Sequence, residues 1–374
     1  MSSQKAGQRP GRAGTGIRVP DRGSALASPQ QLRAFRTGFE RAASAAGGLI
    51  RAPFRVAGER VVLEFASVAL MSRIARPFAH LRCEDGPAAL RIRVWDSEST
   101  GVPLPPELPS PGSVYAQSLP ATVEEHSVRW AFFRPDPGLT AYDAASREAD
   151  YWIPAVSRIT YGDLAGGFRA VFAWDMAQQG LQFLHAAAVA DGGRAGLIVG
   201  RSGSGKSSTS LACLLAGTEF LGDDHCLLDL RATPAVHSIY AAAKLHTSQL
   251  ERFPDVERLV INPDREPPIK GVALLHPEFA GLLPASRPLA AVFVPQISGG
   301  PATAIEPIGP AAALAALAPS TLLQTAAADR GALAAMAKLV RSVPCFRLSL
   351  GTERSEIAGR IRTFLREQVP CPAP

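Results

Sequence analysis

In the first half of the chain, hydrophobic and polar positions alternate in short runs, a pattern that is typical of strands with one buried face. The run at 89–97, ALRIRVWDS, places apolar and charged side chains at every second position and predicts a half-buried strand. Further strands are predicted at 127–134 and around 150–154, and a short helix at 30–46. We interpret residues 30–164 as a small N-terminal α+β domain, in which no catalytic cluster is recognisable.

From about residue 165 the pattern has a longer period. An apolar stripe over 168–181 predicts a helix. Two apolar runs follow, joined by Asp191-Gly192-Gly193, a turn sequence that tolerates positive φ and predicts an antiparallel hairpin. The first run carries His185, and the second leads directly into a glycine-rich segment.

That segment, GRSGSGKS at 200–207, fits the pattern G-x-x-x-x-G-K-[ST] between a predicted strand and a predicted helix. Its glycines allow successive backbone N–H groups to point at one phosphate, and the helix N-terminus adds positive potential there. Lys206 would reach the β- and γ-phosphates, and the Ser207 hydroxyl would ligate Mg²⁺. We therefore predict ATP binding by the segment Gly200, Arg201, Ser202, Gly203, Ser204, Gly205, Lys206, Ser207 and Ser208.

A pair of acids, Asp223 and Asp224, follows a short apolar run soon after this predicted helix. One carboxylate there could serve Mg²⁺ and the other could accept a proton from an attacking hydroxyl; a solvated turn is the alternative. His185, taken alone, is equally consistent with a buried core histidine.

Three other classes of P-loop protein lack their signatures in this chain. No N-K-x-D motif indicates a GTPase, and no arginine-rich lid indicates an adenylate-type kinase. Ser298-Gly299-Gly300 resembles part of an ABC signature, but Pro301 follows it and no strand ending in Asp-Glu comes after.

Composition indicates a globular protein that works in the cytoplasm. Hydrophobic residues make up 47% of the 374 positions and charged residues 19%. The five cysteines are scattered and show no C-x-x-C spacing, as expected in a reducing compartment. The most apolar stretch, 311–328, is interrupted by Pro319 and is not expected to span a membrane.

The net charge of +6 is concentrated at the two ends of the chain. We interpret residues 1–29 as a disordered basic tail. The last segment is expected to be a docking helix with an apolar stripe and a solvated basic face, rather than a nucleic-acid-binding surface. Its arginines are Arg354, Arg360, Arg362 and Arg366.

The stretch FLHAAAVADGGRAGLIVGRSGSGKSS, followed by FLGDDHCLLDL, resembles the catalytic domain of HPr kinase/phosphorylase and the HPr kinase-related proteins, which include kinases encoded beside peptide-maturation genes. The resemblance covers roughly 165–367. It implies an α/β P-loop kinase domain of the HPr kinase/phosphoenolpyruvate carboxykinase type over 165–374, preceded by the small α+β domain.

The resemblance also implies roles for individual residues. Asp223 would be the catalytic base, Asp224 would support the metal together with Ser207, and His185 would be a partner of the carboxylates. Lys206 would act on the transferring phosphoryl group. Lys244 and Lys270 would contact phosphates or substrate, with ordinary solvated lysines as the alternative.

The implied function is ATP- and Mg²⁺-dependent phosphorylation of a serine or another hydroxyl of a protein or peptide. HSIYAAAKLH stands where the family has a Glu-Ile-Arg-Gly segment, and no Gly-Arg-Asn-Leu-Ala loop is recognisable near 322–332. We therefore expect the forward reaction to dominate, with an acceptor other than HPr. The alternative is an ATP-binding regulatory module without a phosphoacceptor. A homo-oligomer is compatible with the sequence.

Overall fold

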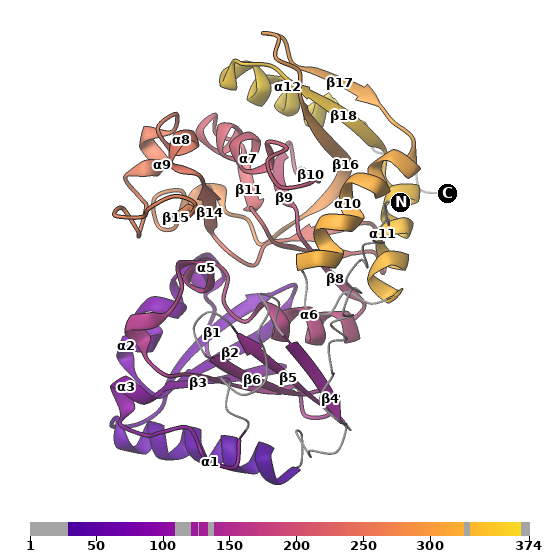
Figure 1. Cartoon of the computed structure of the whole chain (residues 1–374). Helices are drawn as coiled ribbons and strands as arrows, with labels where there is room; N and C mark the ends of the chain where they lie inside the picture. Colours follow the sequence, from indigo (N-terminus) through magenta and orange to yellow (C-terminus); the bar gives the residue numbers. More distant parts are fainter. Residues whose placement is uncertain (1–28, 109–120, 126, 134–137, 325–329, 368–374) are drawn as a thin grey trace, which may run out of the picture.

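The computed structural model of this chain describes residues 29–108, 121–125, 127–133, 138–324 and 330–367 (Figure 1). The predicted basic tail, apart from Pro29, lies outside these residues, as do Cys371 and part of the segment near 322–332. The four cysteines within them are free thiols: Cys83, Cys213, Cys226 and Cys345.

The N-terminal half is built on one mixed sheet. Its strands are β1 (Ile50–Val56), β2 (Glu59–Phe65), β3 (Leu90–Asp96), β4 (Ala121–Glu125), β5 (Val128–Phe133), β6 (Gly138–Asp143) and β7 (Glu148–Ile153). They lie in the order β1-β2-β3-β7-β6-β5-β4, and the β2–β3 and β3–β7 pairs are parallel. The predicted strands at 89–97, 127–134 and 150–154 are confirmed as β3, β5 and β7.

Helix α1 (Pro29–Ala45) covers one face of this sheet, where the sequence predicted a helix at 30–46. Its buried positions, which include Leu32, Phe35 and Phe39, follow helical spacing and face the sheet. The Phe35 ring stacks on Trp130 with 5.9 Å between centroids. Figure 1 shows α1 beneath the sheet, on the side away from the C-terminal half.

The shorter elements of the N-terminal half mostly lie on the opposite face. They are α2 (Val68–Ile74), η1 (Arg76–Leu81), α3 (Ser97–Thr100), η2 (Val156–Arg158), α5 (Tyr161–Ala165) and α6 (Arg169–Gln178). The predicted helix at 168–181 is confirmed as α6, whose buried residues include Val171, Phe172 and Met176. These three residues share one buried cluster with the N-terminal sheet. The boundary at 164/165 stays a prediction, and a continuous core runs across it.

The C-terminal half contains a second, larger sheet and a two-stranded one. The strands are β8 (Leu181–Leu184), β9 (Ala187–Asp191), β10 (Arg194–Ile198), β11 (Glu219–Gly222), β12 (Cys226–Asp229), β13 (Ala235–His237), β14 (Ala242–Leu245), β15 (Gly271–Leu274), β16 (Ser286–Ile297), β17 (Ala304–Pro307) and β18 (Cys345–Leu350). The larger sheet has the order β11-β9-β10-β16-β13-β12-β8, with β18 on β16 and β17 on β18; β14 pairs with β15.

The larger sheet contains the predicted antiparallel hairpin as well as parallel strands. β9 and β10 are antiparallel, and Gly192 and Gly193 between them have φ of 59° and 78°, so the hairpin prediction is confirmed. β10, β16 and β18 run parallel to one another. Their carboxyl ends therefore meet at one edge of the sheet, where ligands bind in many α/β proteins.

Helices α7 (Lys206–Leu215), α10 (Pro310–Gln324), α11 (Arg330–Ser342) and α12 (Arg354–Glu367) cover the two faces of the larger sheet. The short helices α8 (Thr247–Leu250), α9 (Pro254–Glu257) and η3 (Ala280–Leu282) pack around β14 and β15. Leu197 of β10 packs with α10 and α11, and Ile198 packs with α12, because successive strand side chains point to opposite faces. No helix in the described part of the chain has both the length and the apolarity to cross a bilayer.

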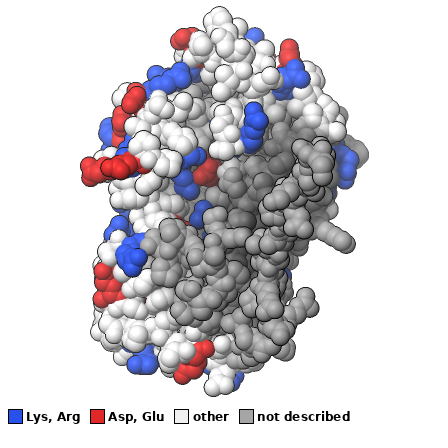
Figure 2. All heavy atoms as spheres, in the orientation of Figure 1, with Lys and Arg blue, Asp and Glu red and all other residues white. Residues whose placement is uncertain are grey.

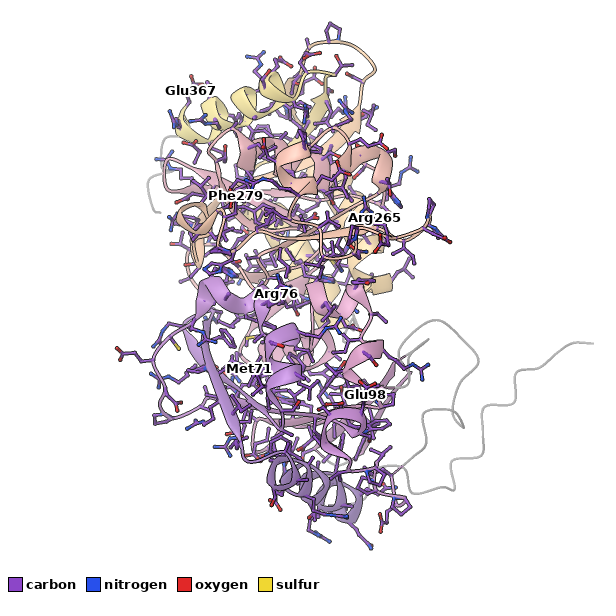
Figure 3. The ribbon with its side chains drawn as sticks, turned by 90° about the vertical axis from the view of Figure 1, so that its left-hand side faces the viewer. Met71, Arg76, Glu98, Arg265, Phe279 and Glu367 are labelled. Atoms are coloured by element: carbon purple, nitrogen blue, oxygen red, sulfur yellow. The ribbon has the colours of Figure 1, made fainter. Side chains whose placement is uncertain are left out.

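The two halves are joined by buried aromatic rings and backbone hydrogen bonds. Phe78 of η1 lies 5.3 Å from Tyr240, centroid to centroid, and the Ala241 amide donates to Pro77 O at 2.8 Å. Figure 3 shows Arg76, the first residue of η1, near the level where the halves meet. The segment leading into β14 is therefore braced by the N-terminal half.

The arginines of α12 are largely solvated, as the sequence predicted, and also contact neighbouring elements: Arg354, Arg360 and Arg366 are exposed and Arg362 is half-buried. Arg362 and Arg366 both pair with Asp191, and Arg360 donates to Thr303 O at 3.3 Å. Arg354 lies over the Phe253 ring. These side chains reach neighbouring elements because α12 lies against the sheet. On the described part of the face in Figure 2, basic and acidic side chains are intermixed rather than gathered in one basic patch.

Candidate functional site

The glycine-rich segment forms a tight loop between β10 and α7, as the sequence predicted. Gly200, Gly203 and Gly205 have φ of 154°, 80° and 103°, a region that residues with a Cβ rarely adopt. A Cβ on Gly200 would come within 2.8 Å of Ser204 Oγ, and one on Gly205 within 2.6 Å of Leu350 Cδ1. The loop conformation therefore requires glycine at these positions.

Lys206 begins α7 and folds back over the loop. Its Nζ donates to Gly200 O at 2.7 Å and to Arg201 O at 3.2 Å, and the residue is buried. Burial lowers the pKa of this ammonium, against the opposing influence of Asp223 and Asp224. The cation is thus held at the centre of the loop beside two carboxylates.

The two acids form a turn between β11 and β12, so their predicted position after a strand is confirmed. Asp224 adopts a φ of 67°, a left-handed conformation that Asp tolerates better than most residues. A Cβ on Gly222 would lie 2.7 Å from His225 O. The turn is closed tightly and fixes both carboxylates relative to α7.

Asp223 lies in the interior behind the turn. Its Oδ2 accepts a hydrogen bond from the Lys244 amide at 3.1 Å, whereas its buried Oδ1 has no partner among the described residues. Burial, together with the charge of Asp224, raises the pKa of Asp223 to about 6, although the hydrogen bond from the Lys244 amide opposes the shift. This carboxyl group therefore changes its charge near neutral pH and has a free oxygen.

Asp224 points the other way and is held by two partners. Its Oδ2 lies 3.2 Å from Lys244 Nζ and its Oδ1 3.5 Å from His185 Nε2. Burial alone would raise the pKa of Asp224, but Lys244 and His185 hold it well below its usual range. Asp224 therefore stays ionised while Asp223 titrates.

His185 lies at a bend between β8 and β9, and not on the hairpin strand as the sequence suggested. The chain changes partners here: β8 pairs with β12 and β9 with β10 and β11, so the backbone cannot continue as one strand. The His185 ring contacts His225 at 5.8 Å between centroids. Burial keeps the pKa of His225 well below its usual value, so His225 is a neutral packing partner.

A cavity of about 420 Å³ joins the loop to the acid turn. Loop residues Gly203, Gly205, Lys206, Ser207 and Ser208 line it together with His185, Asp224, Lys244 and Lys270. The structure thus brings together most of the predicted site, including both lysines. Gly200, Arg201, Ser204 and Asp223 lie outside this lining: the first three shape the loop, and Asp223 lies behind the turn.

Sequence reasoning missed one end of this cavity. Ile297, Leu350 and Thr352 line it at the carboxyl ends of β16 and β18, and Phe253 and Arg354 reach it from the segment before α9 and from the start of α12. A prediction that β10, β16 and β18 are parallel neighbours would have placed the strand ends here. No local signal marks Phe253.

The donor set fits a magnesium ion held partly by phosphates. No group of three or more His, Cys, Asp or Glu side chains arranged to hold a metal occurs among the residues described. Mg²⁺ in nucleotide sites uses one or two carboxylates together with phosphate oxygens and water. Ser207 and Asp224 line the cavity, and the unpartnered Oδ1 of Asp223 lies just behind them, so oxygen ligands are present without a protein cage.

Comparisons with known proteins leave the family open. No family model matches the chain, and no curated protein does. Among solved structures, the chain is similar to the Hpr(Ser) kinase/phosphatase from Coxiella burnetii, with 13% identity over 50% of this chain and 94% of that one. The TM-score is 0.27, so this similarity is distant.

Proposed function

We propose that this protein is an ATP- and Mg²⁺-dependent kinase that transfers the γ-phosphoryl group to a serine, or another hydroxyl, of a protein or peptide. One observation carries the proposal: a single cavity joins a loop shaped for phosphates to Asp224, and Asp223 lies behind this residue in the same turn. A cation, a metal-ligand hydroxyl and a proton acceptor lie together, as phosphoryl transfer requires.

Each residue has a distinct task in this proposal. The loop amides and Lys206 bind the triphosphate and stabilise charge on the transferring group. Ser207 and Asp224 would hold Mg²⁺, which would neutralise charge on the phosphate oxygens. Lys244, already paired with Asp224, and Lys270 flank the same space and are placed to contact phosphate or acceptor.

Asp223 is the base in this scheme. It has the only raised pKa of the pair, about 6, and an oxygen with no partner among the described residues. A base is most effective when its pKa lies near the working pH. Because Asp224 carries a negative charge beside it, Asp223 is the member of the pair that takes up the proton. His185 positions Asp224 through the contact at 3.5 Å.

The test is incubation of the full chain with γ-labelled ATP, Mg²⁺ and serine-containing peptides encoded near this gene, with products identified by mass spectrometry. Phosphoserine formation that depends on Lys206 supports the kinase. Tight ATP binding without any phosphorylated product would instead favour a regulatory module that switches a partner by nucleotide occupancy.

A further inference from the structure

The cavity continues past the phosphate loop to an end that the proposed chemistry does not use. Here the segment after α8 faces the start of α12: Arg252 Nη2 donates to Thr352 O at 3.4 Å. Figure 1 shows α8 and α9 on one side of α7 and α12 on the other. The catalytic acids lie elsewhere, on the β11–β12 turn and beside β14.

Two side chains at this end present surfaces suited to a flat, partly apolar ligand. The Arg354 guanidinium lies 4.8 Å from the centre of the Phe253 ring, and Arg354 both lines the cavity and remains exposed. Ile297 is 68% exposed although it lines the same cavity. A planar cation and an exposed aliphatic chain are the kind of groups against which an aromatic heterocycle packs.

The direction of the triphosphate follows from the chemistry of transfer. In-line attack places the acceptor hydroxyl on the γ-phosphate side, which is the side of Asp223 and Asp224. Phosphate-loop amides hold the α- and β-phosphates beyond the lysine, so the nucleoside extends away from the acids. Ser208, whose hydroxyl donates to Gln249 Oε1 at 3.1 Å, lines that route.

The geometry points to the Arg354–Ile297 end of the cavity as the nucleoside site of a nucleoside triphosphate, an inference that rests on the proposed function. The Arg354 guanidinium stacks on the base, and Phe253 holds the guanidinium flat from behind. Ile297 supplies apolar contact to the base or ribose. This arrangement strengthens binding of nucleotides over bare polyphosphates.

The experiment compares ATP with inorganic tripolyphosphate, both with Mg²⁺, by titration calorimetry on the full chain. Arg354→Ala and Ile297→Ser change exposed side chains, so the fold is retained. Matched controls are Arg360→Ala, on the same helix but directed to Thr303 O, and Ile269→Ser, which is 52% exposed and not part of the cavity lining.

We expect Arg354→Ala and Ile297→Ser to weaken ATP binding about tenfold, as loss of a base-stacking contact does. Tripolyphosphate affinity and both control variants should stay within about twofold of the parent. Equal weakening of ATP and tripolyphosphate by Arg354→Ala would make the arginine a phosphate contact and overturn the inference, and so would unchanged ATP affinity in both variants.

Failure of the proposed function gives a different result. If Arg354→Ala and Ile297→Ser weaken ATP binding as expected but no phosphorylated product forms, the proposed kinase activity is wrong and the nucleoside site is still supported. A parent protein that binds neither ATP nor tripolyphosphate would overturn both.

Discussion

Asp223→Asn should stabilise the nucleotide-free protein while abolishing most of its proposed activity. In the folded chain Asp223 has a pKa of about 6, against an ordinary value of 3.8, because burial and Asp224 disfavour its charged form. A folded-state pKa raised above the unfolded value means that the folded protein binds the proton more tightly. Asp223 therefore contributes most to the stability of the folded protein at low pH, and this contribution is lost as pH rises through about 6.

The magnitude follows from the shift of about two pKa units. At 1.36 kcal/mol per unit, ionised Asp223 costs the fold about 3 kcal/mol at pH 8. The neutral amide removes this cost, and its oxygen can still accept the Lys244 N–H. The stability advantage of the variant should shrink to about 1 kcal/mol near pH 4.5, because Asp223 in the folded protein is then protonated and neutral.

Urea unfolding of the parent and of Asp223→Asn at pH 8 and pH 4.5, without nucleotide or Mg²⁺, measures the difference in their free energies of unfolding. Asp229→Asn is a matched control with the opposite sign: hydrogen bonds from Arg231 lower the pKa of Asp229, so its charged form favours the fold at pH 8 and the amide should destabilise. Phosphoryl transfer by Asp223→Asn should fall by about 10²- to 10⁴-fold with ATP still bound. A parent more stable than Asp223→Asn at pH 8 would refute the electrostatic reasoning.

Three further variants test the remaining roles. Lys206→Ala should lose both nucleotide affinity and transfer, and unchanged binding of ATP with Mg²⁺ in calorimetry would contradict the phosphate-loop assignment. Asp224→Asn should raise the Mg²⁺ concentration needed for half-maximal transfer and be partly rescued by added Mg²⁺; a magnesium dependence equal to that of the parent would count against its metal role. His185→Ala should shift the pH–rate profile more than it changes the urea midpoint, because His185 positions Asp224 in the proposed scheme; an unaltered profile together with a large loss of stability would show that His185 is only a core histidine.

The sequence by itself determined the features whose causes are local. The turn at Asp191-Gly192-Gly193 specifies the hairpin because two successive positive φ values favour glycine. Contiguous residues likewise determine the loop between β10 and α7, because its conformation requires glycine at fixed positions. An apolar stripe at helical spacing identified α6.

The tertiary structure alone decided which distant residues share the site and what charge they carry. His185, Asp224 and Lys244 come from separate segments: β8–β12 pairing brings His185 to Asp224, and the hydrogen bond from the Lys244 amide to Asp223 holds β14 against the same turn. The raised pKa of Asp223 depends on burial behind that turn, which no local pattern encodes. Arg354 and Phe253 lie 101 positions apart in the sequence and meet over the cavity, because side-chain contacts between elements depend on how those elements pack and not on the periodicity of either one.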